Sequence, residues 1–289
     1  MSTGRRLAGA IAAAVTPLRD GGHRLDDEAF RPYADFLVGA ELDGILAFGT
    51  NGEAVLLSVE ERQRGLELWL EAVAGRALVA AHCGAQTTAA TVALARHARH
   101  AGADAVAVIG PPYFKLDARE QRAHLLAAAQ ACAPLPFYVY EFAATAGYAL
   151  DPSMLASLRD EVENVVGMKV SDTPWTAFER YLLDGFDIFV GPESLIHLGR
   201  EAGAVGAVSA LASAFPADVA AVVREPTEAG AARLGALRQK VESFPRQAAL
   251  KRVVGRRGIP MRPDVRPPLR DLDAAEQASL EAWLDEATE

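Results

Sequence analysis

The sequence has few cysteines, no long apolar run and no excess of positive charge. Its two cysteines, Cys83 and Cys132, cannot build a disulfide framework, so we expect a reducing, cytoplasmic environment. A formal charge of −9 disfavours nucleic acid and an anionic membrane as partners. The apolar stretch after the N-terminal arginines is too short to span a membrane, and no cleavage site follows it. We expect a first buried strand there.

Lysine is also scarce, since four lysines stand against twenty-five arginines. Lys169 alone lies within an apolar run, residues 165–170, whereas the surroundings of Lys115, Lys240 and Lys251 are polar or arginine-rich. A lysine in a core loses the hydration of its charge, and a neutral amine can attack a carbonyl to form a Schiff base. A lysine at a strand end can instead reach water or pair with a carboxylate. The run alone leaves both interpretations open.

Eight short apolar runs alternate with helix-start patterns along the chain. Their continuous apolarity is typical of parallel strands that are covered on both faces. The runs are residues 10–15, 44–48, 77–81, 105–109, 137–140, 165–169, 187–190 and 205–208. Four helix starts carry a capping side chain: Ser58 with Glu61, Asp117 with Glu120, Asp151 before Pro152, and Thr173 before Pro174.

Eight strand–helix units predict an α/β fold of the (β/α)8 TIM barrel type with a C-terminal helical extension. An open doubly wound sheet is disfavoured because no Gly-x-Gly-x-x-Gly follows the first run. We predict one domain over residues 1–289. Residues 1–214 would form the barrel core, and residues 215–289 the last barrel helix and the extension.

Active residues of such barrels come from the carboxyl ends of the strands. Lys169 ends the sixth run, and this position favours the interpretation of Lys169 as a nucleophile. The turn at residues 49–53, Gly-Thr-Asn-Gly-Glu, follows the second run, and its N–H groups with Thr50 and Asn51 suit a carboxylate. Tyr140 ends the fifth run, where a phenol can exchange protons with the lysine. Taken singly, the turn and the tyrosine are each more often structural.

Together these segments resemble the dihydrodipicolinate synthase and N-acetylneuraminate lyase family of Schiff-base pyruvate aldolases. The likeness covers almost the whole chain and rests on the order and spacing of its segments. These are residues 15–17, 49–53, 57–62, 84–88, 111–114 (Pro-Pro-Tyr-Phe), 140–147, 167–169 (Gly-Met-Lys) and 266–269 (Arg-Pro-Pro-Leu).

The resemblance implies that Lys169 forms an imine with pyruvate or another small 2-oxo acid, and that Tyr140 is the acid and base. Thr50 would hydrogen-bond Tyr140 and, with Asn51 and Gly49, hold the substrate carboxylate. The imine is covalent, so no metal or organic cofactor is implied. A homotetramer or a dimer is implied.

Further candidates lie at other strand ends. We predict substrate contacts for Gly191, Glu193 and Ser209, although Glu193 is explained equally well as the acid of a helix first turn. His82 is a candidate substrate contact or proton carrier, and a packing role is an equal alternative. Glu141 is expected to be a solvated charge, with a functional role as the alternative.

Two of the chain's departures from the family pattern bear directly on the reaction. After the fourth strand the family usually has Tyr-Tyr, and its second tyrosine reaches a relay in a neighbouring subunit. This chain has Tyr113 and Phe114, so Phe114 cannot carry a proton; Tyr113 or water substitutes, or the relay is shorter. The lysine-pathway synthases carry an arginine where this chain has Thr145. No arginine or lysine occurs among residues 123–158, which disfavours their condensation reaction.

The leading hypothesis is therefore a lyase that reversibly cleaves a 2-oxo-3-deoxy acid and releases pyruvate. A dehydratase acting through the same imine is the main alternative. A non-catalytic paralogue that binds an oxo acid is a third, favoured by Phe114. A phosphate-binding barrel ranks last, because residues 203–206 are the only glycine-rich segment near the last two runs.

Overall fold

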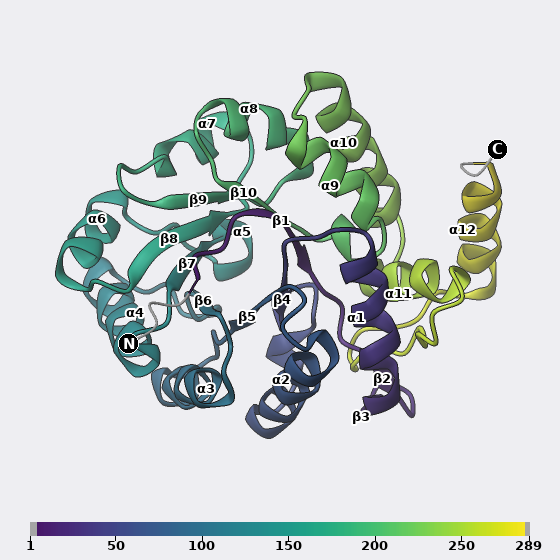
Figure 1. Cartoon of the computed structure of the whole chain (residues 1–289), viewed down its shortest axis with the longest axis horizontal. Coiled ribbons are helices and arrows are strands. Elements are labelled where there is room, and N and C mark those ends of the chain that lie inside the picture. Colours follow the sequence, from purple (N-terminus) through teal and green to yellow (C-terminus); the bar gives the residue numbers. More distant parts are fainter. Residues whose placement is uncertain (1–4, 287–289) are drawn as a thin grey trace.

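The computed structural model describes residues 5–286; residues 1–4 and 287–289, which the predicted domain limits include, lie outside it. Eight parallel strands close into a barrel in the order β1-β10-β9-β8-β7-β6-β5-β4, and helices surround it (Figure 1). The predicted (β/α)8 barrel with C-terminal helices is confirmed. The barrel strands are β1 (Gly9–Ala13), β4 (Gly44–Ala47), β5 (Leu78–His82), β6 (Ala105–Ile109), β7 (Phe137–Glu141), β8 (Val165–Val170), β9 (Asp187–Val190) and β10 (Gly206–Ser209).

Helices connect these strands and continue past the last one. Those around the barrel are α1 (Phe30–Gly39), α2 (Val59–Val73), α3 (Thr88–Ala101), α4 (Ala118–Cys132), α5 (Ala143–Ala146), α6 (Pro152–Glu161), α7 (Trp175–Phe178), α8 (Ile196–Glu201) and α9 (Pro216–Arg224). The extension contains α10 (Glu228–Glu242), α11 (Arg246–Arg256) and α12 (Ala274–Glu286). A small antiparallel hairpin, β2 (Leu18–Arg19) with β3 (Arg24–Leu25), has no counterpart among the predicted runs.

The predicted helix starts are confirmed at three of the four positions. Ser58 and Asp117 form capping boxes, and Asp151 accepts hydrogen bonds from the first turn of α6. The cap predicted at Thr173 is wrong. The chain enters α7 through Pro174, which occupies the cap position itself, so Thr173 lies one residue too early to accept a bond from the helix.

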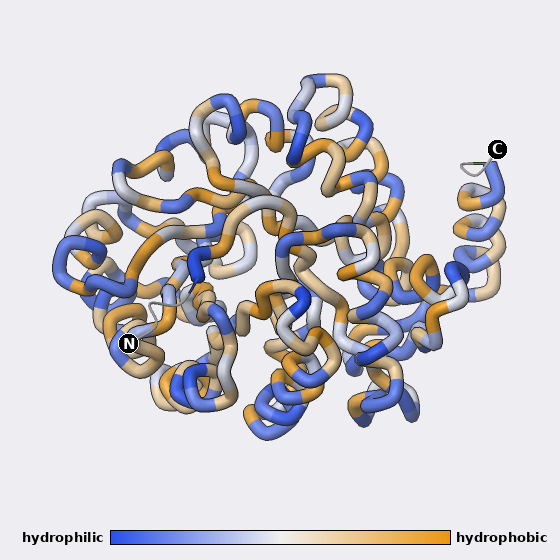
Figure 2. Tube along the Cα trace, in the orientation of Figure 1, coloured by the Kyte–Doolittle hydropathy of each residue, from blue (hydrophilic) through white to orange (hydrophobic). Residues whose placement is uncertain are grey.

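Two groups of buried residues form the core. One consists of strand residues and Leu7 inside the barrel and includes Ile11, Tyr138 and Phe189. The larger one lies between the strands and the surrounding helices. These helices carry alternating hydrophobic and hydrophilic stretches along their turns, as expected for elements with one buried face (Figure 2).

A register shift turns Lys169 toward the barrel interior. The pairing of β7 with β8 skips Val166, and beyond this point Lys169 lies opposite Tyr140. A one-residue shift exchanges the two faces of a strand, so the residues after it point to the opposite side. A Cβ on Gly167 would lie 2.2 Å from the Asp187 carbonyl oxygen, so the irregular segment requires glycine.

A buried ion pair joins the turn at residues 49–53 to the extension. The Lys251 Nζ donates to Glu53 Oε1 at 2.7 Å and to the Asp264 carbonyl at 2.6 Å, and the Arg266 N–H donates to Glu53 Oε2 at 2.7 Å. Both charged side chains are fully buried. The arginines near Lys251 in the sequence do not keep it exposed, because α11 turns its side chain inward. Burial lowers the pKa of Lys251, and the Glu53 carboxylate opposes this shift.

Lys251→Met should lower the free energy of unfolding by about 3–5 kcal/mol, because it leaves the Glu53 carboxylate buried without its counter-ion. Urea unfolding measures this loss. The exposed pair of Arg224 with Glu41 provides a control, since Arg224→Met should cost less than about 1 kcal/mol. In the double variant Glu53→Gln/Lys251→Met the loss should be smaller than the sum of the single losses. Additive losses would mean that the two groups do not stabilise each other.

Candidate active site

A cavity of about 360 Å³ opens at the carboxyl ends of the barrel strands. Its volume lies in the range of small-molecule sites. Lys169 and Tyr140 line it from the strands, Thr50 and Asn51 from the turn after β4, and Gly191 and Glu193 from the segment after β9. Residues of α10 and α11 line it from the extension. The cavity therefore lies where active sites of these barrels are found.

Lys169 and Tyr140 are in direct contact. The Lys169 Nζ lies 4.3 Å from the centre of the Tyr140 ring, and both side chains are buried, with exposed fractions of 9 % and 3 %. Phe142 stacks on the Tyr140 ring at 6.3 Å, and His82 meets it edge-on at 5.9 Å. The phenol is thus held between two rings with its hydroxyl facing the cavity residues.

The surroundings of Tyr140 favour its ionised form. Burial alone would raise the pKa of Tyr140, but the Lys169 charge and hydrogen bonds from Thr50, Ser171 and Lys169 together lower it. The Thr50 hydroxyl lies 3.4 Å from the Tyr140 hydroxyl. A phenol with a lowered pKa beside an amine is suited to accept and return a proton.

The turn at residues 49–53 leaves the N–H groups of two cavity-lining residues unengaged. The Gly49 carbonyl accepts from the N–H groups of Gly52 and Ala54, whereas the N–H groups of Thr50 and Asn51 have no acceptor among residues 5–286. Such paired donors form a concave site for an anion. The Asn51 side chain donates to the Ala13 carbonyl at 2.8 Å, so it fixes the turn in addition to lining the cavity.

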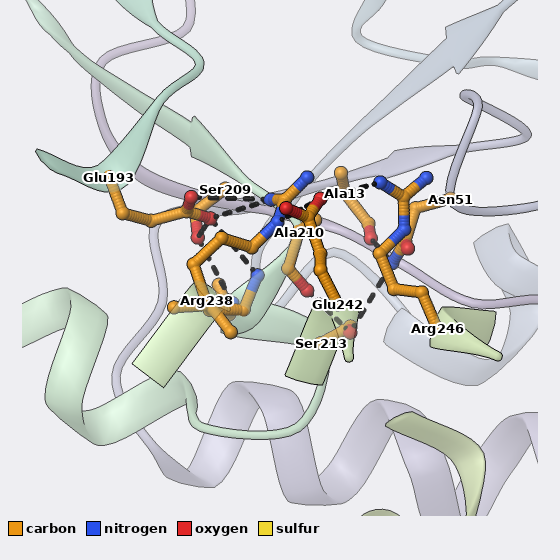
Figure 3. Close-up of polar contacts among 11 residues, drawn as sticks. Ala13, Asn51, Glu193, Ser209, Ala210, Ser213, Arg238, Glu242 and Arg246 are labelled. Atoms are coloured by element: carbon orange, nitrogen blue, oxygen red, sulfur yellow. Dashed lines mark hydrogen bonds and ion pairs between the residues drawn. The ribbon is translucent and has the colours of Figure 1, made fainter. Parts of the chain in front are cut away.

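Glu193 is buried and hydrogen-bonded on several sides (Figure 3). It accepts from the Ser209 hydroxyl at 2.6 Å, from the Leu211 N–H at 3.2 Å and from Arg238 at 3.2 Å. Ser209 is fully buried behind Glu193 and is not among the residues that line the cavity, so its predicted role becomes one of positioning. Gly191 lines the cavity, and a Cβ there would lie 2.3 Å from Ser171 Oγ.

His82 lies behind Tyr140 rather than on the cavity wall. Its Nδ1 lies 2.9 Å from the Phe48 carbonyl oxygen, and its Nε2 accepts from the Ile109 N–H at 3.3 Å. Burial, reinforced by the charge of Arg62, lowers the pKa of His82 to about 3. With both ring nitrogens engaged and the ring neutral, these contacts favour the packing role over substrate contact.

The solvated charge expected at Glu141 is wrong. This side chain is 1 % exposed, and its Oε2 accepts from the Leu150 N–H at 3.0 Å. The expectation failed because a glutamate one residue past Tyr140 was taken to lie outside the strand, whereas β7 includes it. Burial, with a smaller contribution from the Asp172 charge, raises the pKa of Glu141 to about 8.

Tyr113 and Phe114 lie away from the cavity. They are 85 % and 72 % exposed, and their rings contact each other edge-on at 5.0 Å. No described residue of this single chain covers them, so their role between subunits stays a prediction. Thr145 is part of α5 and does not line the cavity.

Three charged residues of the site were missed by the sequence reasoning. Arg238 and Glu242 of α10 and Arg246 at the start of α11 all line the cavity. These side chains come from helices about a hundred residues beyond Thr145, and α10 ends before α11 begins. Only Arg238 and Glu242, four positions apart on α10, form a pattern that the sequence could have revealed.

The family model for the dihydrodipicolinate synthetase family matches residues 6–287. An uncharacterised DapA-like lyase of Halobacterium salinarum is 34 % identical over 96 % of this chain and 93 % of its own. A 4-hydroxy-tetrahydrodipicolinate synthase of Thermus thermophilus is 34 % identical over 73 % of this chain and 71 % of its own. The chain belongs to the dihydrodipicolinate synthetase family.

Solved structures agree. The Proteus mirabilis N-acetylneuraminate lyase superposes with a TM-score of 0.88 at 29 % identity, covering 98 % of this chain and 99 % of the other. The prophage protein YagE of E. coli, solved in complex with pyruvate, gives 0.89 at 25 % identity with the same coverage. The named relatives are thus synthases and lyases. Within residues 5–286, no helix has the length and apolarity to cross a membrane, and no three His, Cys, Asp or Glu residues group as metal ligands.

The free energy of unfolding of the wild type should fall as pH rises, and Glu141→Gln should abolish this fall. The folded chain keeps the Glu141 proton up to about pH 8, whereas an unfolded glutamate releases it near pH ~4.3. Between these values the unfolded state binds fewer protons, so stability falls as pH rises, by up to about 1.4 kcal/mol per pH unit. Glutamine keeps the acceptor for Leu150 and cannot ionise. Urea unfolding of both proteins at about pH 5.5 and about pH 7.5 measures this effect. The free energy of unfolding of the variant, relative to that of the wild type, should be higher at the higher pH. A difference that stays constant would contradict a buried, protonated Glu141.

Proposed function

We propose that this protein is a Schiff-base-forming carbon–carbon lyase that reversibly cleaves a small 2-oxo-3-deoxy acid and releases pyruvate. The observation that carries the proposal is the contact of the Lys169 amine with the Tyr140 ring at 4.3 Å, inside a cavity whose wall also offers two free N–H groups. A nucleophile, a proton carrier and an anion site at one cavity are the groups that imine chemistry on an oxo acid requires.

Binding precedes the chemistry. The N–H groups of Thr50 and Asn51 hold the substrate carboxylate, which directs the adjacent 2-oxo carbon toward Lys169. The Lys169 amine attacks this carbon and transfers one of its protons to the oxygen; Tyr140 donates the second proton, so that the oxygen leaves as water. The product is a protonated imine between Lys169 and the substrate. Thr50, at 3.4 Å from the Tyr140 hydroxyl, keeps the phenol oriented during this exchange.

Cleavage then uses the imine as an electron acceptor. The ionised Tyr140 removes the proton of the C4 hydroxyl, the C3–C4 bond breaks, and its electron pair moves to the imine nitrogen to give an enamine. The C4 fragment leaves as an aldehyde. Tyr140 returns a proton to C3, and water hydrolyses the imine to free pyruvate and Lys169. These reaction steps require no metal or organic cofactor.

Two relatives support this choice of reaction. One structural neighbour is an N-acetylneuraminate lyase, and another was solved in complex with pyruvate. The lowered pKa of Tyr140 supports its use as a base toward the C4 hydroxyl. A dehydratase would share the imine and differ in the bond that breaks, so product analysis for pyruvate separates the two reactions.

Pyruvate with borohydride should attach irreversibly to Lys169, because reduction converts a transient imine into a stable amine. Mass spectrometry of the intact protein should show one adduct, and peptide mapping should place it on the Lys169 peptide. Lys169→Met should abolish the adduct, whereas Lys115→Met, which removes an exposed lysine, should retain it. An adduct on another lysine, or none at all, would refute the proposed function.

Tyr140→Phe should lower kcat by about 10²–10⁴-fold, the usual contribution of a general acid–base group. The matched control is Tyr138→Phe. Tyr138 lies two residues earlier on the same face of β7, and its hydroxyl accepts from the Leu7 N–H at 2.9 Å, away from the cavity. Steady-state assay of pyruvate release should show a large loss only for Tyr140→Phe. Equal activities of the two variants would remove Tyr140 from the mechanism.

A further inference from the structure

Two arginines of the extension face the cavity but differ in how completely they are paired. Arg238 and Arg246 flank Glu242, whose Oε1 accepts from both (Figure 3). The Arg238 Nε lies 2.7 Å from this oxygen, and the Arg246 Nη1 lies 3.1 Å from it. Glu242 is thus shared as a counter-ion.

Arg238 has two carboxylate partners. Besides Glu242, it binds both oxygens of the buried Glu193, at 3.4 and 3.2 Å. Burial alone would lower the pKa of Arg238, but the two carboxylates outweigh this and raise it. Its charge is therefore already neutralised within the protein, and its guanidinium holds Glu193 in place.

Among residues 5–286, Arg246 has one carboxylate partner, the shared Glu242. Its Nε is buried and has no hydrogen-bond partner, and its Nη2 donates to no group among residues 5–286. Burial lowers the pKa of Arg246, and the neighbouring charge of Arg238 lowers it further. A buried donor without an acceptor costs about 1–3 kcal/mol, so an acceptor supplied from outside would bind favourably.

The free groups of Arg246 have a defined geometry. Nε and Nη2 form the side edge of the guanidinium plane, and this edge binds the two oxygens of a carboxylate or phosphoryl group in parallel. Since Nη1 is engaged by Glu242, the plane is fixed, and the Nε and Nη2 edge has no partner among residues 5–286. Arg246 lines the same cavity as Lys169 and Tyr140.

We propose that Arg246 binds a second anionic group of the substrate, a carboxylate or a phosphoryl group remote from the 2-oxo acid end. This inference rests on the proposed function and names its substrate class, a dianionic 2-oxo-3-deoxy acid. The first carboxylate has its own donors in the N–H groups of Thr50 and Asn51. The cavity runs from Lys169 to α10 and α11, so one molecule can occupy both anion sites.

Thr145 leaves a second substrate carboxylate without a cation in its own segment, and Arg246 provides one. The segment around Thr145 offers no cation, but α11 supplies one from a different side of the same cavity. Arg246 acts here as a specificity-determining residue, and the imine chemistry stays with Lys169 and Tyr140.

The test compares 2-oxo-3-deoxy acids of equal length that end in a carboxylate, a phosphate ester or a hydroxyl. The wild type should prefer the acids with an anionic end by at least about ten-fold in kcat/KM. The substrate with the highest kcat/KM shows whether Arg246 binds a carboxylate or a phosphoryl group. Arg246→Gln should remove most of this preference, mainly through KM. Arg246→Lys, which keeps the charge but loses the planar edge, should retain only part of it. The control Arg233→Gln, on the exposed face of α10, should leave the preference unchanged.

Borohydride trapping of pyruvate on Lys169 separates the two proposals. If no adduct forms with any oxo acid, the proposed function fails. If the adduct forms and the wild type cleaves the hydroxyl-ended acid as well as the anionic ones, only the present inference fails. It also fails if Arg246→Gln raises the half-saturating pyruvate concentration for trapping as much as the KM of the anionic substrate. That result would assign Arg246 to the first carboxylate.

Discussion

The buried pair of Glu53 and Lys251 is the interaction on which the arrangement of the cavity depends. Glu53 occupies a left-handed backbone conformation at the end of the turn, and both of its carboxylate oxygens are bound. One oxygen binds Lys251 of α11, and the other binds the Arg266 N–H. The turn that offers the N–H groups of Thr50 and Asn51 is therefore fixed from the C-terminal side. Removing one member of such a pair costs more than the pair contributes, because the remaining charge stays buried.

The same pair also positions α11, which carries Arg246 on the cavity wall. Arg246 precedes Lys251 by five residues on α11, which is about 7.5 Å along the helix axis. Anchoring Lys251 against Glu53 thus sets how far Arg246 reaches over the barrel mouth. Both groups that we assign to anion binding, the turn and Arg246, are tied to one buried contact. A shift of α11 would alter them together.

The parts of the fold that were predictable have local causes. Each strand is a continuous apolar run, because both of its faces are covered, and capping at Ser58 and Asp117 depends on residues three positions apart. Lys169 and Tyr140 could be named because strand ends in a barrel converge on one mouth. The inward orientation of Lys169 was not predictable in this way. It depends on the register shift at Val166, which the apolar run does not reveal.

The unpredicted features have non-local causes. Several arginines lie near Lys251 in the sequence, yet its Nζ is buried against a carboxylate 198 positions away. Glu141 follows a tyrosine at a strand end, but the segment up to Leu150 covers it. Whether a charge is solvated depends on which segments pack over it, and composition around the residue does not contain that information.

This division between local and non-local features also separates chemistry from specificity. The groups assigned to imine formation, Lys169 and Tyr140, lie on adjacent barrel strands, whose register fixes them opposite each other. Arg238 and Arg246, which line the same cavity, come from helices outside the barrel. Substitution on α10 or α11 can therefore change the charge of the cavity wall without altering the strands that carry the lysine and the tyrosine. Under the proposed function, the side chains that the extension places along the cavity would therefore select the substrate, while the barrel strands would hold the imine-forming pair.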